Sequence, residues 1–302
     1  MLNDSSKSEF HVTENTFLFP VVKSWEIYLQ DQGKSIHTIK AFVSDIMMLV
    51  NFLPAGVTIS IISLQDLNAF LEWIREGRGV PCSPKTFARR VTSIKSFFRW
   101  LHVNGRISNN PAENVVQHSV ISPIPEILTS LEQDSIKRAV AKYRTEDIPD
   151  LRYETLYTLL ISTGIKKGEC LNLLTNHIVM DTPAEPYLFV RYSNPGNRYK
   201  ERKILLTKEW VNLFNDYKDQ VQPLDKVFPW SPRRLEYLLE DLGKAAGLTK
   251  HLSFDMCRWT CALNDWKSNQ EHDSIRQKLG ISKIQWREIS MKLRMLAEEN
   301  PD

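Results

Sequence analysis

The sequence predicts a mainly α-helical chain of two domains, with one small β-hairpin in the second domain. Apolar residues recur at helical spacing behind Ser or Pro start signals over most of the chain. A Pro- and Asn-rich stretch without periodicity divides the chain, and one pair of strand-like segments flanks the turn "SNPGN". With 302 residues, the chain is long enough for two domains of ordinary size.

Four helices are predicted in a first domain over residues 17–110, after a polar segment 1–16 that we expect to be flexible. The helical patterns cover residues 17–33, 35–53, 63–77 and 83–105. The second, third and fourth patterns begin with serines as expected N-caps, and the fourth also has Pro at its first helical position and Gly at its end.

The fourth predicted helix has an apolar stripe and a basic face. The stripe consists of Phe87, Val91, Ile94, Phe98 and Leu101. The opposite face has no acidic residue, so no ion pair can form along it, and it consists of Lys85, Arg89, Thr92, Lys95, Ser96 and Arg99. This face is either an ordinary solvated surface or a contact surface for phosphates. Residues 21–106 contain eleven Lys and Arg against six Asp and Glu, a local excess that favours a polyanion as partner.

Residues 111–123 are predicted to be a linker, and residues 124–302 a second domain. Two helical patterns begin this domain, and the strands of a hairpin follow at 185–192 and 198–206. Four further helical stretches are predicted at the end of the chain: 207–221, 231–247, the segment "FDMCRWTCALNDW" over 254–266, and 272–280 continuing into 282–300.

Arg258 is set among core-type residues in the segment 254–266. An unpaired charge in such surroundings is costly, so Arg258 needs an anion nearby. One candidate is Asp255, which lies one helical turn earlier in the same segment. The other candidate is an anion supplied from outside the chain.

Composition excludes several classes of protein. The hydrophobic fraction of 42% and the charged fraction of 25% are typical of a soluble globular protein. No apolar run is long enough to cross a membrane, and the N-terminal residues are too polar for a signal peptide. Four cysteines are scattered without metal-ligand spacing, so we expect free buried thiols, a cytoplasmic protein, no metal and no cofactor.

Several segments resemble the tyrosine recombinase (phage integrase, Xer-like) family in the same order along the chain. "TIKAFVSDIMMLVNFL", "SPKTFARRVTSIKSFFRWL" and "RISNNPAENV" are similar to its SAM-like core-binding domain. "LLISTGIKKGECLNLLTNHI", "RYKERKILL" and "HLSFDMCRWTCALNDWKSNQEHDSIRQKLG" resemble parts of its catalytic domain. The resemblance covers roughly residues 20–290 and implies a SAM-like four-helix domain followed by a catalytic-type helical domain with a small sheet.

The resemblance also implies which positions carry the chemistry of the family. A tyrosine attacks a DNA phosphate to form a covalent 3′ intermediate, two arginines and one or two histidines bind the phosphate oxygens, and a lysine protonates the leaving oxygen. Only the second arginine matches, as Arg258. The first arginine, the lysine, the two histidines and the tyrosine are replaced in this sequence by Lys166, Asn197, Asp255, Ile281 and Ser290.

These replacements predict a cleavage-deficient DNA-binding protein with an accessory or regulatory role in DNA recombination, integration or transposition. The alternative is an active recombinase with a displaced active site. The predicted partners are duplex DNA, bound in the bacterial nucleoid, and an active recombinase or transposition proteins; self-association is expected through Trp286, Ile289, Leu293 and Leu296, unless this stripe packs on its own domain. The expected DNA contacts are Thr38, Lys40, Lys85, Arg89, Lys95, Arg99, Lys166, Arg198, Lys200, Arg202 and Arg258.

Overall fold

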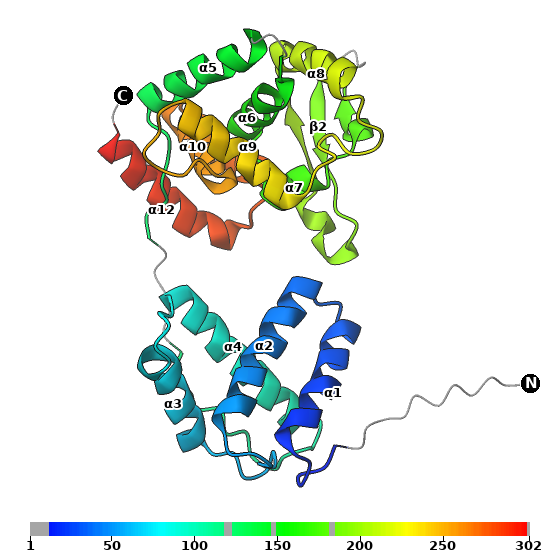
Figure 1. Cartoon of the computed structure of the whole chain (residues 1–302), viewed down its shortest axis with the longest axis vertical. Coiled ribbons are helices and arrows are strands. Elements are labelled where there is room, and N and C mark those ends of the chain that lie inside the picture. Colours follow the sequence, from blue (N-terminus) through cyan, green and yellow to red (C-terminus); the bar gives the residue numbers. More distant parts are fainter. Residues whose placement is uncertain (1–11, 118–122, 146–148, 181–184, 301–302) are drawn as a thin grey trace, which may run out of the picture. The chain divides into compact units, whose positions relative to one another are not determined.

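The computed structural model describes residues 12–117, 123–145, 149–180 and 185–300 (Figure 1). The chain divides into two compact units, Met1–Ser122 and Pro123–Asp302, each with its own hydrophobic core. The predicted second domain, residues 124–302, begins one residue after the start of the second unit. Most described residues are helical, and the strands form one small antiparallel sheet.

The described part of the first unit, residues 12–117, contains four α-helices, as predicted. They are α1 (Leu18–Asp31), α2 (Ile36–Phe52), α3 (Leu64–Glu72), which continues into the π-helical turn η1 (Trp73–Gly77), and α4 (Pro84–Val103). The predicted N-caps are confirmed, because the side chains of Ser35, Ser63 and Ser83 each accept a hydrogen bond from a backbone N–H in the first turn. Gly105 adopts a φ of 65°, which only glycine adopts without strain, and ends the α4 segment.

The core of the first unit is rich in aromatic side chains. Trp25 of α1 stacks on Phe42 of α2 and meets the edge of Phe97 of α4. The predicted stripe of α4 faces this core, with four side chains buried and Phe87 half-buried against them. The segment predicted as a linker begins later than expected, because Ala112 and Val115 are buried in the same core.

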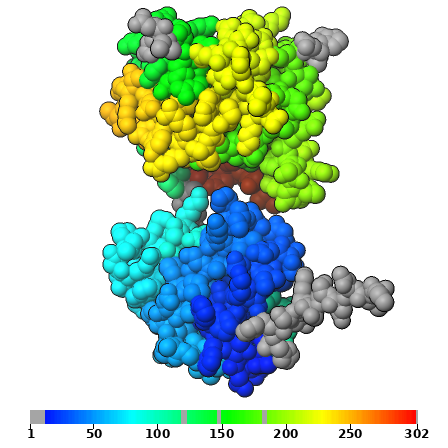
Figure 2. All heavy atoms as spheres, turned by 45° about the vertical axis from the view of Figure 1, so that its right-hand side comes forward, coloured from blue at the N-terminus to red at the C-terminus, as the bar shows by residue number. Residues whose placement is uncertain are grey.

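The second unit is built around α6, which packs against α5, α8, α9 and α10. α9 lies on the surface of this unit (Figure 2, yellow). The helices are α5 (Ser130–Thr145), α6 (Leu151–Thr163), α7 (Lys167–Leu171), α8 (Lys208–Val221), α9 (Pro232–Ala245), α10 (Phe254–Lys267), α11 (His272–Leu279) and α12 (Lys283–Glu299).

The sheet has the strand order β1 (Ile178–Val179), β2 (Tyr187–Val190) and β3 (Arg202–Leu205), with both pairs antiparallel. The predicted hairpin is confirmed in its pairing but not in its turn. The connection is longer than "SNPGN" and contains the 3-10 helix η3 (Pro195–Lys200). The sequence pattern missed α7 and the two-residue β1, which are too short to show a period. It also joined α11 to α12, which Gly280 separates with a φ of 58°.

Candidate functional site

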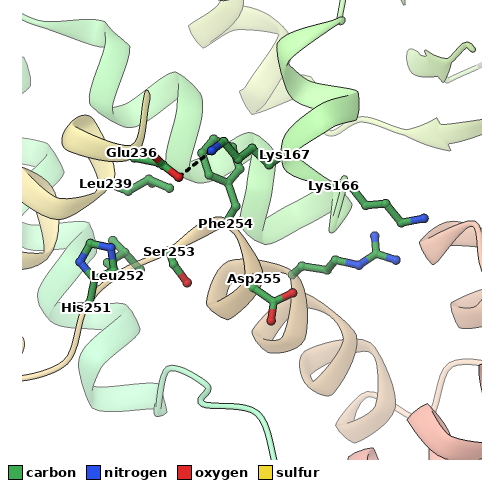
Figure 3. A pocket seen from close by; sticks show the side chains of 10 residues that line it. Lys166, Lys167, Glu236, Leu239, His251, Leu252, Ser253, Phe254 and Asp255 are labelled. Atoms are coloured by element: carbon green, nitrogen blue, oxygen red, sulfur yellow. Dashed lines mark hydrogen bonds and ion pairs between the residues drawn. The ribbon is translucent and has the colours of Figure 1, made fainter. Parts of the chain in front are cut away.

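A pocket of about 440 Å³ opens in the second unit between α9 and the N-terminal ends of α7 and α10. It brings together three of the family's catalytic positions, Lys166, Asp255 and Arg258. Figure 3 shows Lys166 at one end of the pocket, His251 and Leu252 at the other, and Asp255 between them. The resemblance implied that these three positions lie together, and in the structure they line one pocket.

Short caps and turns position the polar side chains of the pocket. Gly164 ends α6 with a left-handed φ of 60°, and the chain then turns so that Lys166 becomes the N-cap residue of α7. A Cβ at Gly164 would lie 3.2 Å from Cys261 Sγ, so α6 and α10 are in close contact at this point. Ser253 accepts a hydrogen bond from the backbone N–H of Met256 and so begins the α10 helix that carries Asp255 and Arg258.

Arg258 is held by backbone carbonyls rather than by a carboxylate. It donates from Nη1 to the Gly164 carbonyl and from Nη2 to the Leu279 carbonyl, the latter at 2.6 Å. Both carbonyls lie at C-terminal ends of helices, which carry partial negative charge. Among the described residues, no ion pair joins Arg258 to Asp255, so the first of the two candidate anions that the sequence left open is not its partner. Burial lowers the pKa of the Arg258 guanidinium, which nevertheless stays charged at neutral pH.

Lys166 is half-buried and lies in the field of several other cations. Burial lowers the pKa of its ammonium, the Glu169 carboxylate opposes this shift, and Arg258, Arg202 and Lys200 lower the pKa further. Within the described part of the chain, the Lys166 ammonium has no hydrogen-bond or ion-pair partner. At the rim of the pocket, Lys167 donates to Glu236 at 2.6 Å (Figure 3). The Lys166 end of the pocket is therefore positively charged and suited to an anion.

The buried carboxylate of Glu169, beside the pocket, accepts hydrogen bonds from three other residues. Arg202 donates to it from Nη1 at 3.0 Å and from Nη2 at 2.9 Å, and the Tyr192 hydroxyl and the Lys166 backbone N–H also donate to it. Burial alone would raise the pKa of Glu169, but these donors outweigh burial and lower it to about 2. Arg202 also donates from Nε to the Lys278 carbonyl, and only about a tenth of its side chain is exposed. The guanidinium of Arg202 therefore bonds to groups within the second unit, contrary to the expectation that it would contact DNA.

The other family positions do not line the pocket. Asn197 lies on η3, where its Oδ1 accepts a hydrogen bond from Lys200 at 2.8 Å, and Arg198 on the same segment is exposed. Ile281 is buried in an apolar cluster with residues of α10, α11 and α12. Ser290 lies on α12, and its hydroxyl donates to the Arg287 carbonyl one turn earlier at 3.2 Å.

The apolar stripe of α12 packs on the second unit itself. Leu293 and Leu296 are buried, and Trp286 and Ile289 are partly buried against Ala262, Leu263 and the apolar residues of α11. Of the two alternatives drawn from the sequence, packing on its own domain is therefore the observed one. These four side chains are not available together for self-association.

The expected DNA contacts of the first unit differ in their surroundings. Lys40, Lys85 and Arg99 are exposed, whereas Thr38 contacts the cap residue Ser35 with its hydroxyl at 2.9 Å. Lys95 donates to the Val115 carbonyl at 2.6 Å. Arg89, by contrast, donates to the buried carboxylate of Asp45 on α2, as does Ser93, and Arg90 lies 3.6 Å from the same carboxylate.

The role of Asp45 was not predicted from the sequence, because its partners Arg89 and Ser93 lie on another helix. The signal was present, since Asp45 is the one charged residue in the apolar stretch "AFVSDIMMLV". His251 and Glu236 in the pocket, which the chain brings in from two other segments, were not predicted either. In the described residues, no group of three or more His, Cys, Asp or Glu is arranged to hold a metal ion, and no described helix is long and apolar enough to span a membrane.

Sequence comparisons identify known proteins that are similar to this chain. Residues 22–105 match the family described as "Phage integrase, N-terminal SAM-like domain". A tyrosine recombinase of Thermosipho africanus is 28% identical over 211 residues, which cover 69% of this chain and 70% of that protein. Tyrosine recombinase XerD of Listeria innocua is 22% identical over 277 residues, covering 86% of this chain and 89% of its own.

Solved structures share the fold at low sequence identity. XerH site-specific recombinase, in a post-cleavage complex with its palindromic difH substrate, gives a TM-score of 0.71 at 16% identity, covering 93% of this chain and 82% of its own. A lambda integrase dimer bound to a COC′ core site gives 0.70 at 18% identity, covering 91% and 95%. The matched N-terminal domain, the relatives along most of the chain and this shared fold together support membership of the tyrosine recombinase family.

Proposed function

We propose that this protein binds duplex DNA and takes part in DNA recombination without cleaving the DNA itself. Its role would be accessory or regulatory, in integration or transposition, beside an active recombinase of the same cell. The observation that carries the proposal is the composition of the pocket and of α12. Lys166 and Arg258 supply cations for a backbone phosphate, but the position of the nucleophile is Ser290, and residues 238–302 contain no tyrosine.

The surroundings of Ser290 support the absence of cleavage. A serine hydroxyl is a weak nucleophile unless a base takes its proton. Its described hydrogen bond is to a carbonyl of its own helix, and the following histidine position of the family is the buried Ile281. Loss of a single donor from a transition-state clamp costs about a hundredfold in rate, and this site lacks several donors at once.

The exposed cations support duplex binding. Lys40, Lys85 and Arg99 in the first unit and Arg198 in the second carry charge at the surface. The related structures include recombinases bound to their DNA sites, and we extend duplex binding to this chain on the strength of the shared family. We keep the expectation of a cytoplasmic protein, bound to the nucleoid through DNA, as part of this proposal.

Two measurements test the proposal. Duplexes that bind the protein are first selected from a random library, and binding is then followed by mobility shift at low ionic strength. The selected duplexes are next nicked near the centre, so that any strand cleavage would trap a covalent product, and denaturing gels are searched for it. We expect a mobility shift without a covalent product. A covalent band that Ser290→Ala abolishes would instead establish the alternative, an active recombinase with a displaced site.

A further inference from the structure

The pocket contains an acidic group that a site for phosphate alone does not explain. Asp255 stands where the family has a histidine, and it lines the same pocket as Lys166 and Arg258 without forming an ion pair with either. It is exposed, and within the described residues it forms neither an ion pair nor a side-chain hydrogen bond. A carboxylate at this place repels a phosphate, but it is a good acceptor for a hydroxyl or amine carried by the same ligand.

The pocket is also larger than one phosphate ion requires, and part of its lining is apolar. A volume of about 440 Å³ lies within the range of about 300–1,000 Å³ that is usual for small-molecule sites. Beyond Asp255, the wall is formed by the apolar side chains of Leu239, Leu252 and Phe254, with the His251 imidazole at the end (Figure 3). The order along the pocket is therefore cations, a carboxylate and then an apolar wall.

We propose that this pocket binds a free ribonucleoside monophosphate. Its phosphate would lie against Arg258 and Lys166, its ribose hydroxyls would donate to Asp255, and its base would lie on the apolar wall beside His251. Acidic side chains commonly accept hydrogen bonds from ribose hydroxyls in nucleotide sites. The inference rests on the proposed function only in that both use the cations Lys166 and Arg258, so the nucleotide would compete with a DNA phosphate for the second unit.

Isothermal titration calorimetry at low salt, with a chelator present, tests the inference with four probes: AMP, its 2′,3′-dideoxy analogue, adenosine and inorganic phosphate. AMP is expected to bind about tenfold more tightly than phosphate or adenosine, because it fills both ends of the pocket. The dideoxy analogue is expected to bind several-fold more weakly than AMP. Equal affinities for AMP and phosphate, or for AMP and the dideoxy analogue, would overturn the inference.

Three variants assign the contacts. Asp255→Asn should weaken AMP binding about threefold or more without weakening binding of the dideoxy analogue, and Asp219→Asn, an exposed change on α8 outside the pocket, should leave both unchanged. Lys166→Met removes a charge that has no described internal partner, so it should lower AMP affinity about tenfold in a folded protein, whose folding is checked by circular dichroism. Equal effects of the two Asp variants, or none from Lys166→Met, would contradict the proposed contacts.

Duplex binding is measured in parallel at the same salt concentration. A protein that shifts duplex DNA but does not bind AMP would overturn the nucleotide inference alone. A protein that binds AMP but shifts no duplex would overturn the proposed function alone. Added AMP is expected to weaken the duplex complex of the unsubstituted protein, and about tenfold more AMP should be needed for the same effect on that of Lys166→Met.

Discussion

The guanidinium of Arg202 and the carboxylate of Glu169 form a paired, two-bond contact, with N–O distances of 3.0 and 2.9 Å. Arg202 comes from β3 and Glu169 from α7, so the pair ties the sheet to the helix that Lys166 precedes. Arg202 and Arg258 also bond to the consecutive carbonyls of Lys278 and Leu279 at the end of α11. One network therefore fixes both the Lys166 and the Arg258 sides of the pocket.

Glu169→Gln is expected to destabilise the protein by about 3 kcal/mol, because it leaves the buried Arg202 without its anion. The pKa of Glu169 is about 2 in the folded protein, below the value of about 4.3 in an unfolded chain. Its stabilisation is therefore complete above about pH 5 and is lost as the pH falls toward 2. Urea unfolding at several pH values should show a flatter decline between pH 5 and 2.5 in the variant.

Glu298→Gln, at an exposed position of α12, is the matched control and should change neither the stability nor its pH dependence. If Glu169→Gln and Glu298→Gln behaved alike, Glu169 would not hold Arg202 in the way that the structure shows.

Gly280→Ala tests the packing of Arg202 against the turn between α11 and α12. A Cβ at this position would lie 2.6 Å from Arg202 Nη1, and the φ of 58° disfavours any side chain. We expect a loss of about 3 kcal/mol in the free energy of unfolding. Gly247→Ala is the comparison, because Gly247 has a φ of 75° but open space around it, and should cost only about 1 kcal/mol. Equal losses would show that the Arg202 contact is unimportant.

Lys85→Gln combined with Arg99→Gln tests α4 as a DNA surface. Both side chains are exposed and take no part in the Asp45 network. If each neutralises one phosphate, the plot of log affinity against log salt should become shallower by about 2, with unchanged thermal stability. Filter binding over a range of salt concentrations measures this slope. An unchanged slope would remove α4 from the interface. Arg89 is unsuitable for the test, because its loss would remove the closer of the two arginines that pair with the buried Asp45 carboxylate and would leave only Arg90 at 3.6 Å.

The cysteines are expected to react very unequally with a thiol reagent. Cys82 is half-exposed, whereas the other three are buried. Burial raises the pKa of Cys257 to about 12 and that of Cys261 to about 11, and raises the pKa of Cys170 further still. At pH 8 the folded protein should release about one equivalent of chromophore from an aromatic disulfide reagent, and Cys82→Ser should abolish it. Rapid reaction of several thiols in the folded protein would contradict the burial of the cysteines of α7 and α10.

The sequence was sufficient to predict elements whose signals lie within one short segment. Serine caps and the apolar stripe of α4 predicted the helices of the first unit, and the order of motifs predicted that Lys166, Asp255 and Arg258 share a site. Ion pairs between residues of different segments could not be predicted from such local signals. Arg89 was expected to contact DNA because its partner Asp45 lies on another helix, and Arg202 was expected to do so because its partner Glu169 precedes it by 33 residues.

Arg258 shows the same limit within a single helix. An acidic residue at helical spacing suggested a salt bridge, but the guanidinium bonds to the ends of α6 and α11 instead. Spacing along a helix indicates which side chains of that helix can meet. It does not indicate which hydrogen-bond acceptors from other segments the fold will bring closer.

The mass of the intact protein after incubation with a nicked, selected duplex tests the central claim most directly. The account predicts that all of the protein keeps its mass of 35.1 kDa, although the same sample shows a DNA complex under native conditions. A species heavier by the mass of one oligonucleotide, mapped by digestion to a residue of the second unit, would contradict it.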